Sequence, residues 1–302
     1  MGSPFSPHSV QTQSIAAVFH LVLVIASVVF LVVAAGVIYS CVRYQGRGVT
    51  ASDPRPIFGS RNLEILWTVV PLAIVITLFV VTVRAMVLID APQNAGQTAD
   101  LTITGHQWWW DARYPNGAVA TGDIHIPAGR RLLVRLESAD VIHDFWAPEL
   151  ARKMDAVPGR PSYLWLEADT PGAYSGACSE FCGAQHAWMR FRVVAEPEAD
   201  FQAWLQRQIQ PPPEPTGVAA EGARLFRSKK CADCHAFGQK GPDLTHLATR
   251  ALLGAGISPN TPQTLALWLT KSQAAKPGNR MPDTPLSSPE VQALLAYLES
   301  LR

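Results

Sequence analysis

Two long apolar segments near the N-terminus constrain the fold most strongly. They cover residues 15–42 and 66–83, and the second has no charged residue in 18 positions. A helix that crosses the ~30 Å hydrocarbon core of a bilayer needs roughly 20 apolar residues. The alternative for the first segment is a cleaved signal peptide, which its length and the absence of Lys or Arg before it disfavour. The alternative for the second is a buried core helix. The sequence therefore predicts a hairpin of two transmembrane helices within residues 1–89.

The charges that flank these segments predict the orientation of the hairpin. The connecting segment is rich in arginine, with Arg43, Arg47, Arg55 and Arg61 against Asp53. Residues 1–14 contain no Lys or Arg. Because short cytoplasmic loops of membrane proteins carry an excess of basic residues, we expect this loop to be cytoplasmic. Both chain ends, and everything after Asp90, are then expected outside the cytoplasm.

Residues 90–210 have the pattern of an all-β domain. Short runs of β-branched and aromatic residues alternate with Gly- and Pro-containing turns, which favours a sandwich or Greek-key barrel. The strand candidates are residues 100–105, 131–137, 162–168 and 190–195. A short amphipathic helix should follow, because apolar residues recur there at helical spacing. They are Phe201, Trp204, Leu205 and Ile209.

A proline-rich stretch, residues 211–216, predicts a stiff linker before an all-α domain over residues 217–302. Thr261-Pro262 and Ser288-Pro289 each have the residues of a helix N-cap followed by proline at the first helical position. A further helix is expected over residues 221–229.

A C-x-x-C-H sequence in this helical domain indicates covalent attachment of a c-type haem. Cys231 and Cys234 would bond to the haem vinyl groups, and His235 would be the proximal ligand of the iron. A redox-active C-x-x-C or half of a zinc site are the alternatives, and the flanking helices favour haem. Met281 is the predicted sixth ligand, because a thioether is an established partner of histidine on haem iron. His246 is the rival for that role.

The other cysteine pair lies in a segment dense in soft metal ligands. Cys178, Cys182, His186 and Met189 offer thiolate, imidazole and thioether groups, which together select copper over hard cations. A disulfide is the alternative for the two cysteines, but it leaves the histidine and the methionine unexplained. A mononuclear blue-copper site needs only one cysteine, so the second favours a dinuclear centre with bridging thiolates.

A dinuclear centre needs a second histidine from elsewhere in the chain. The candidates are His106, His125 and His143, and spacing alone does not choose among them.

Here the sequence resembles a known family. Residues 178–189 are similar to the CuA loop of cytochrome c oxidase subunit II, and residues 141–146, VIHDFW, resemble the second histidine segment of that family. The resemblance implies a cupredoxin-like Greek-key domain that holds a dinuclear CuA centre. The implied ligands are His143, Cys178, Cys182, His186, Met189 and the backbone carbonyl of Glu180. His106 and His125 are then expected to be structural.

Other segments resemble the same family in the expected order. Residues 105–110, GHQWWW, resemble the segment whose first tryptophan receives the electron, here Trp108, although Trp109 stands where the family usually has tyrosine. Residues 153–160 resemble the segment that faces subunit I. Glu64 matches a glutamate at the mouth of a proton path into subunit I, with a solvated helix flank as the alternative. The side chain of Glu180 would help to bind magnesium at the interface with subunit I.

Residues 217–302 resemble class I cytochrome c in the order of their parts. The whole chain therefore resembles subunit II of a caa-type haem-copper oxidase, with a membrane hairpin, a cupredoxin-like domain and a fused cytochrome c domain. The resemblance implies that electrons pass from haem c to CuA and on to subunit I. Oxygen would be reduced to water there, coupled to proton pumping.

The resemblance also implies partners and a location. Subunit I, subunit III and membrane lipid are the expected partners, in a bacterial cell (inner) membrane with the redox domains outside the cytoplasm. The electron donor would be a cytochrome bc complex or a soluble cytochrome c. No nucleic acid is expected, because the net charge is only +1. The alternatives are a CuA-bearing subunit of a nitric oxide or nitrous oxide reductase, and a membrane-tethered electron carrier or copper-delivery protein.

The two redox domains carry opposite charge. Residues 90–210 have 10 Lys and Arg against 15 Asp and Glu, a net charge of −5. Residues 217–302 have 10 Lys and Arg against 6 Asp and Glu, a net charge of +4. Opposite charge on tethered domains favours their encounter. We therefore expect the haem domain to dock transiently on the copper domain near Trp108.

Overall fold

The computed structural model describes residues 2–45, 56, 58–93, 98–235 and 240–302. These form two compact units. The helical unit is Gln13–Asp90, and the globular unit joins the residues up to Thr12 with Ala91–Arg302. Of the charges that predicted the orientation of the hairpin, Arg47, Asp53 and Arg55 lie outside the described residues.

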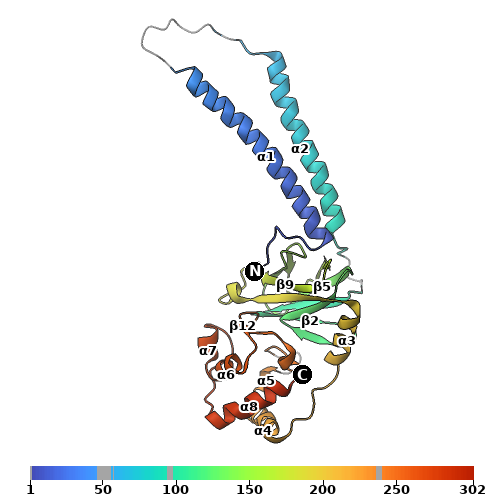
Figure 1. Ribbon diagram of the computed structural model, residues 1–302, viewed down its shortest axis with the longest axis vertical. Helices are drawn as coiled ribbons and strands as arrows, with labels where there is room; N and C mark the ends of the chain where they lie inside the picture. Colours follow the sequence, from blue (N-terminus) through green and yellow to red (C-terminus); the bar gives the residue numbers. More distant parts are fainter. Residues whose placement is uncertain (1, 46–55, 57, 94–97, 236–239) are drawn as a thin grey trace. The chain divides into compact units, whose positions relative to one another are not determined.

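Two long helices account for the apolar segments (Figure 1). α1 (Val10–Arg43) has 34 residues and α2 (Arg61–Ile89) has 29. At ~1.5 Å per residue each is longer than the ~30 Å hydrocarbon core, and each is apolar enough to cross a membrane. Large apolar side chains are exposed along both helices. The prediction of two long apolar helices is confirmed.

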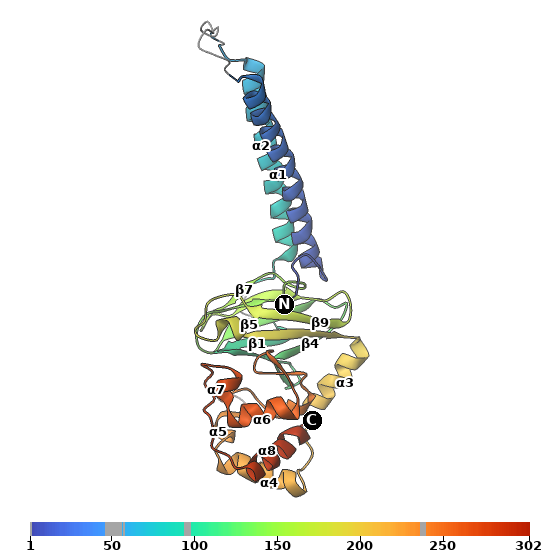
Figure 2. The ribbon, with the colours of Figure 1, turned by 60° about the vertical axis from the view of Figure 1, so that its left-hand side comes forward.

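The β-domain is a sandwich of two five-stranded sheets (Figure 2). Its strands are β1 (Leu101–His106), β2 (Trp109–Arg113), β3 (Val119–Thr121), β4 (Asp123–Pro127), β5 (Leu132–Ser138), β6 (His143–Trp146), β7 (Met154–Ala156), β8 (Ser162–Leu166), β9 (Gly172–Cys178) and β10 (Arg190–Glu196). The first sheet has the order β3-β2-β1-β5-β8 and the second β4-β10-β9-β6-β7. Among the strand pairs of the described residues, β1–β5 and β4–β10 are parallel and the other pairs in these two sheets are antiparallel. The four predicted strands correspond to β1, β5, β8 and β10.

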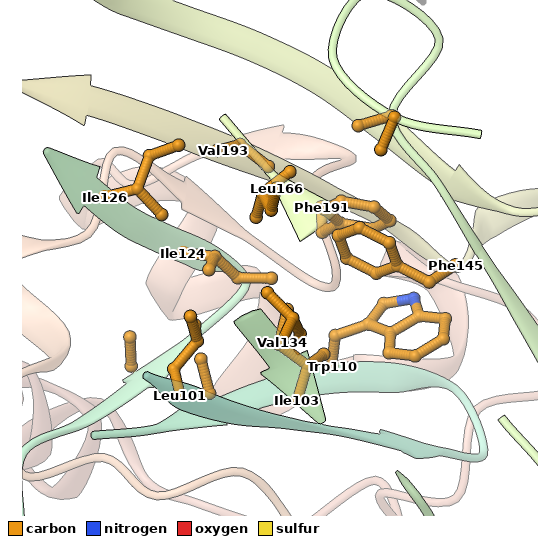
Figure 3. Close-up of a cluster of buried hydrophobic side chains, with 14 of the residues drawn as sticks. Leu101, Ile103, Trp110, Ile124, Ile126, Val134, Phe145, Leu166, Phe191 and Val193 are labelled. Atoms are coloured by element: carbon orange, nitrogen blue, oxygen red, sulfur yellow. The ribbon is translucent and has the colours of Figure 1, made fainter. Parts of the chain in front are cut away.

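An aromatic cluster packs among the aliphatic side chains of the core between the sheets (Figure 3). The Trp110 ring meets Phe145 and Phe191 edge-on, with centroids 5.6 and 5.7 Å away, and the two phenyl rings stack at 4.4 Å. Phe145 on β6 pairs with Cys178 on β9. The cluster therefore supports the backbone from which the cysteine-rich loop departs.

The segment before α1 is attached to the β-domain. Ser9 Oγ donates a hydrogen bond to the Leu150 carbonyl at 2.6 Å. The backbone of His8 donates to Glu149 at 2.8 Å and accepts from Asp169 at 2.8 Å. The N-terminal segment and the β-domain therefore form one folded body.

Helices dominate the C-terminal part of the globular unit. After α3 (Glu198–Gln208) come α4 (Gly217–Ser228), α5 (Ala232–His235), α6 (Pro262–Thr270), α7 (Ser272–Ala275) and α8 (Ser288–Ser300), with a short hairpin of β11 (Leu252–Leu253) and β12 (Ser258–Pro259). α4 and α8 cross at Gly222, where a Cβ would lie 1.9 Å from the Ala293 carbonyl oxygen. Only glycine allows the two helices to approach so closely.

One predicted helix start is confirmed and one is wrong by a residue. Thr261 caps α6 as predicted, since its Oγ1 accepts from the Thr264 backbone N–H at 3.3 Å. The cap of α8 is Ser287, not Ser288. Ser287 forms a capping box with Glu290, whose Oε2 accepts from the Ser287 backbone N–H at 2.8 Å. That reciprocal pairing moves the cap one residue toward the N-terminus.

Candidate copper and haem sites

The two cysteines of the β-domain lie side by side. Cys178 ends β9, and the chain loops back so that its backbone N–H donates to the Met189 carbonyl at 2.9 Å. The two sulfur atoms are 3.7 Å apart, and both thiols are free. A disulfide has an S–S distance of ~2.05 Å. The pair therefore faces a shared position without a covalent bond.

His143 approaches the cysteines from β6. It is fully buried, and its Nδ1 lies 3.9 Å from the Cys178 sulfur. Its Nε2 lies 2.8 Å from Oδ1 of Asp140. When the carboxylate accepts a hydrogen bond from Nε2–H, Nδ1 is left as the ligand atom. Gly105 makes room for the ring, since a Cβ there would lie 2.8 Å from His143 Cδ2.

The remaining predicted ligands complete the cluster. His186 Nδ1 and Met189 Sδ lie 3.8 and 3.7 Å from the Cys182 sulfur. The carbonyl oxygen of Glu180 lies 3.2 Å from the Cys178 sulfur. The structure therefore brings together all six groups that the sequence resemblance implied as copper ligands.

Close packing shifts the pKa values at this cluster. A hydrogen bond from Cys182 lowers the pKa of Cys178 to about 3. The same bond, followed by burial, raises the pKa of Cys182. Burial opposes a charge on His143, but hydrogen bonds to Cys178 and Asp140 outweigh it and raise the pKa of that histidine. A bound cation would displace the protons that the two thiols carry.

Trp108 and Gln107 both contact the cysteine loop. The indole Nε1 of Trp108 donates to the Cys182 carbonyl at 3.0 Å, and Gln107 Nε2 donates to the same oxygen at 2.7 Å. Gly183, at φ +116°, allows this approach, because a Cβ there would lie 3.1 Å from the Trp108 ring. Trp108 is half-buried. It therefore connects the surface to the backbone of a predicted copper ligand.

The other candidate histidines contact carboxylates away from the cluster. His106 Nε2 is 2.9 Å from Asp111, and its ring stacks on Trp109 at 3.9 Å. His125 Nδ1 is 2.8 Å from Glu196, and its ring stacks on a tryptophan of α3 at 4.1 Å. The structure thus gives both histidines structural contacts, and the cluster holds only His143 of the three candidates.

The C-x-x-C-H sequence begins at Cys231, directly before α5, and ends at His235, the last residue of that helix. His235 Nδ1 lies 3.0 Å from the Pro242 carbonyl, which accepts from it and leaves Nε2 as the ligand atom. Burial lowers the pKa of His235 and so favours the neutral imidazole that binds iron. Cys231 packs against the leucine-rich core of the domain, and both thiols are free. These features fit a covalently attached haem.

Met281 follows α7 in a tied loop. Its backbone N–H donates to Asn279 Oδ1 at 2.7 Å, and its carbonyl accepts from Ser272 Oγ at 2.6 Å. The rival ligand His246 is buried and its Nε2 is 3.1 Å from the Gln208 carbonyl. That hydrogen bond engages one of the two ring nitrogens of His246.

Models of three protein families match successive parts of the chain. The model described as cytochrome c oxidase subunit II, transmembrane domain, matches residues 5–84. The periplasmic domain of the same subunit matches residues 119–196, and cytochrome c matches residues 219–302.

Curated relatives extend over the whole chain. Cytochrome c oxidase subunit 2 of Alkalihalophilus pseudofirmus is 34% identical, over 98% of this chain and 90% of its own length. The chain belongs to the cytochrome c oxidase subunit 2 family. The subunit 2 of Bacillus sp. strain PS3 is 30% identical, over 85% of this chain and 79% of its own length. This family member is therefore an oxidoreductase subunit of an oxidase complex that includes the catalytic subunit.

Solved structures match individual parts of this subunit 2. The periplasmic domain of cytochrome oxidase subunit II of Bradyrhizobium japonicum is 31% identical and covers 37% of this chain and 95% of its own, with a TM-score of 0.35. A haem-copper terminal oxidase dimer is 22% identical and covers 44% of this chain and 99% of its own, with a TM-score of 0.37. The family implies haem and copper cofactors, a membrane location and an extracytoplasmic domain.

Three further predicted features of this subunit 2 involve side chains outside the copper cluster. Glu64 is exposed in the first turn of α2, on a shallow groove that Arg61 and Thr68 also line. The side chain of Glu180 is exposed. In the segment predicted to face subunit I, Lys153 lies over the Trp146 ring, 4.6 Å from its centroid.

Sequence reasoning missed the carboxylate that orients His143. Asp140 accepts from the backbone N–H of Val141 and of Gln107, both at 2.7 Å, in addition to its contact with the imidazole. It therefore holds the histidine and the Trp108 segment together. A carboxylate three residues before a ligand histidine was the available signal.

Proposed function

We propose that this subunit receives electrons at its cytochrome c domain and delivers them, through a dinuclear CuA centre, to the catalytic subunit of a proton-pumping oxidase. The observation that carries the proposal is the cluster of two thiols 3.7 Å apart, flanked by two imidazoles and a thioether. Thiolate, imidazole and thioether groups together favour copper over hard cations.

The donor set fits two copper ions. Cys178, Cys182, His143, His186, Met189 and the Glu180 carbonyl would hold them. Bound copper would supply a one-electron centre whose geometry changes little on reduction, which would permit fast electron transfer. The protein holds its donors in place beforehand, because β6, β9 and the start of β10 are fixed by their sheet.

The residues around the cluster have distinct tasks. Asp140 orients His143 by accepting from its Nε2, and Gly105 leaves space for the ring. Trp108 donates to the Cys182 carbonyl and reaches the surface, so it provides the route by which an electron arrives. The buried rings of Trp110, Phe145 and Phe191 would keep water from the side of the copper site that faces the core.

In the cytochrome c domain, Cys231 and Cys234 would hold haem c covalently, His235 would be its proximal ligand and Met281 its sixth ligand. The Pro242 carbonyl orients His235. Methionine opposite histidine raises the potential of a haem. The domain would accept electrons from a cytochrome bc complex or a soluble cytochrome c.

The expected topology is a two-span protein with both termini outside the cytoplasm. The N-terminal segment supports it, because His8 and Ser9 are bonded to the β-domain that belongs to the extracytoplasmic side. Glu64 would then lie at the cytoplasmic boundary, at the mouth of a proton path, and Glu180 would meet subunit I and a magnesium ion. Subunit III and membrane lipid remain expected partners. The domain boundaries at residues 89, 210 and 216 also remain predictions.

The test uses the purified full-length chain in detergent. We expect two copper ions and one covalent haem per chain. After a light pulse delivers one electron to the haem, the haem should be oxidised rapidly while the copper centre becomes reduced. Absence of copper, or haem that keeps its electron while oxidised copper is present, would contradict the proposal.

A further inference from the structure

The loop that carries Met281 lies against the cysteine loop of the β-domain. Lys276, at the end of α7, is only 3% exposed. Its Nζ donates to the Trp188 carbonyl at 3.0 Å and to the Gly254 carbonyl at 3.1 Å. Trp188 directly precedes the predicted copper ligand Met189. One ammonium group therefore joins the haem domain to the copper loop.

Arg280 makes a second contact with the copper domain. Its guanidinium lies over the Trp108 ring, 5.3 Å from the centroid, and it is hydrogen-bonded to Gln107 Oε1. Gln185, in the cysteine loop, donates in return to the Pro277 carbonyl. The residue next to the predicted haem ligand thus covers the predicted electron-receiving tryptophan.

Two glycines in the haem domain let the backbones approach. Gly278 has φ +82°, and a Cβ there would lie 3.1 Å from Gln185 Nε2. Gly256 has φ +79°, and a Cβ would lie 3.2 Å from Arg190 Cβ. Beside it, the Arg190 backbone N–H donates to the Ala255 carbonyl at 3.1 Å. These features indicate a fitted interface rather than a chance encounter.

The chemistry of Lys276 explains why it can hold this interface. A buried ammonium group is costly unless hydrogen bonds replace its hydration. Here one of its two carbonyl acceptors belongs to each domain. Withdrawal of the haem domain would break the bond to Trp188.

We propose that Lys276 is a positioning residue that, together with Arg280, holds the Met281 loop over Trp108. Electrons then reach the copper domain from the haem of the same chain. The haem is then the entry point for an external donor, because Arg280 lies over the Trp108 ring. This inference rests on the proposed electron transfer from haem to copper.

The test combines two measurements on the full-length, metal-loaded chain in detergent. Hydrogen exchange at the Arg190 amide reports docking, because its acceptor lies across the interface. The rate of haem oxidation after a light pulse reports electron transfer. The variants are Lys276→Met and Arg280→Met. Lys271→Met is the matched control, because it removes the same charge from an exposed lysine of the same domain.

We expect Lys276→Met to speed exchange at Arg190 by about 10- to 100-fold, the effect of losing a hydrogen bond from a charged donor. Haem oxidation should slow, and a soluble electron donor should gain direct access to the copper. A protein that merely unfolded would lose both routes of electron transfer. Arg280→Met provides a second variant whose described side-chain contacts lie across the interface, so its effect cannot come from the haem domain core.

The inference would be overturned if the rate of hydrogen exchange at the Arg190 amide were the same in both variants as in the unaltered chain. An equal increase in the Lys271→Met control would overturn it too. Failure of the proposed function is distinguishable: the unaltered chain would then show no transfer from haem to copper, whatever the exchange rates.

Discussion

Asp140 offers the sharpest test of how the copper site is built. Asp140→Asn keeps the shape of the side chain but removes the negative charge of the carboxylate, which accepts a hydrogen bond from His143 Nε2 at 2.8 Å. The neutral amide is a weaker acceptor than the carboxylate, and no water can take the place of that partner because the imidazole is fully buried. Loss of such an outer partner typically weakens metal binding by about 10- to 100-fold. That factor corresponds to roughly 1.4–2.7 kcal/mol.

The assay is competition for copper between the full-length protein and a chelator of known affinity, followed by the absorbance of the copper–thiolate bonds. Asp111→Asn is a matched control, because Asp111 contacts His106 at 2.9 Å in the same domain but lies outside the cluster. We expect Asp140→Asn to release copper at about 10- to 100-fold lower chelator concentration, while the control behaves as the unaltered protein. Equal affinity in all three proteins would refute this reasoning, as would an equal loss in the control.

Three further substitutions probe the packing and the electron route. Gly105→Ala should overlap the ring of His143 and lower the free energy of unfolding by about 1–3 kcal/mol, which a denaturant titration would detect; an unchanged midpoint contradicts the close packing. Trp108→Phe should slow reduction of the copper centre and leave its copper content unchanged, as measured by rapid mixing and metal analysis. An unaltered rate would remove this residue from the route. Gly222→Ala should destabilise the crossing of α4 and α8, which lowers the melting temperature of the haem domain; an unchanged melting curve would mean that the helices separate at no cost.

Local sequence spacing predicted much of the site. Cys178, Cys182, His186 and Met189 lie within one short loop, so their residue types alone indicate copper. Met189 and Cys178 are brought together by the backbone bond that closes the loop. Features of this kind need no knowledge of the tertiary fold.

The choice of His143 could not come from spacing. It reaches the cysteines because β6 pairs with β9, and no local pattern encodes that pairing. The resemblance to a family supplied the assignment instead. Asp140 was missed for the same reason, since its function depends on where the histidine ring points.

Contacts between the domains were the least predictable. The charges of the two halves indicated attraction, yet the contacts of Lys276 are with backbone carbonyls, which carry no charge pattern in the sequence. The strands β2, β3, β4, β6, β7 and β9 also escaped prediction. Of these, β3 and β7 have only three residues each, and β9 leads into the metal loop. Ser288, next to the proline, was the predicted cap of α8, but Ser287 caps the helix because it forms a capping box with Glu290.

An electron paramagnetic resonance spectrum of the oxidised full-length protein tests the central claim most directly. We predict a hyperfine pattern in which one unpaired electron is shared equally between two copper nuclei, beside the signal of a low-spin haem. The spectrum of a single copper ion would contradict a dinuclear centre at Cys178 and Cys182. A copper-silent spectrum with these two cysteines joined in a disulfide would contradict it as well.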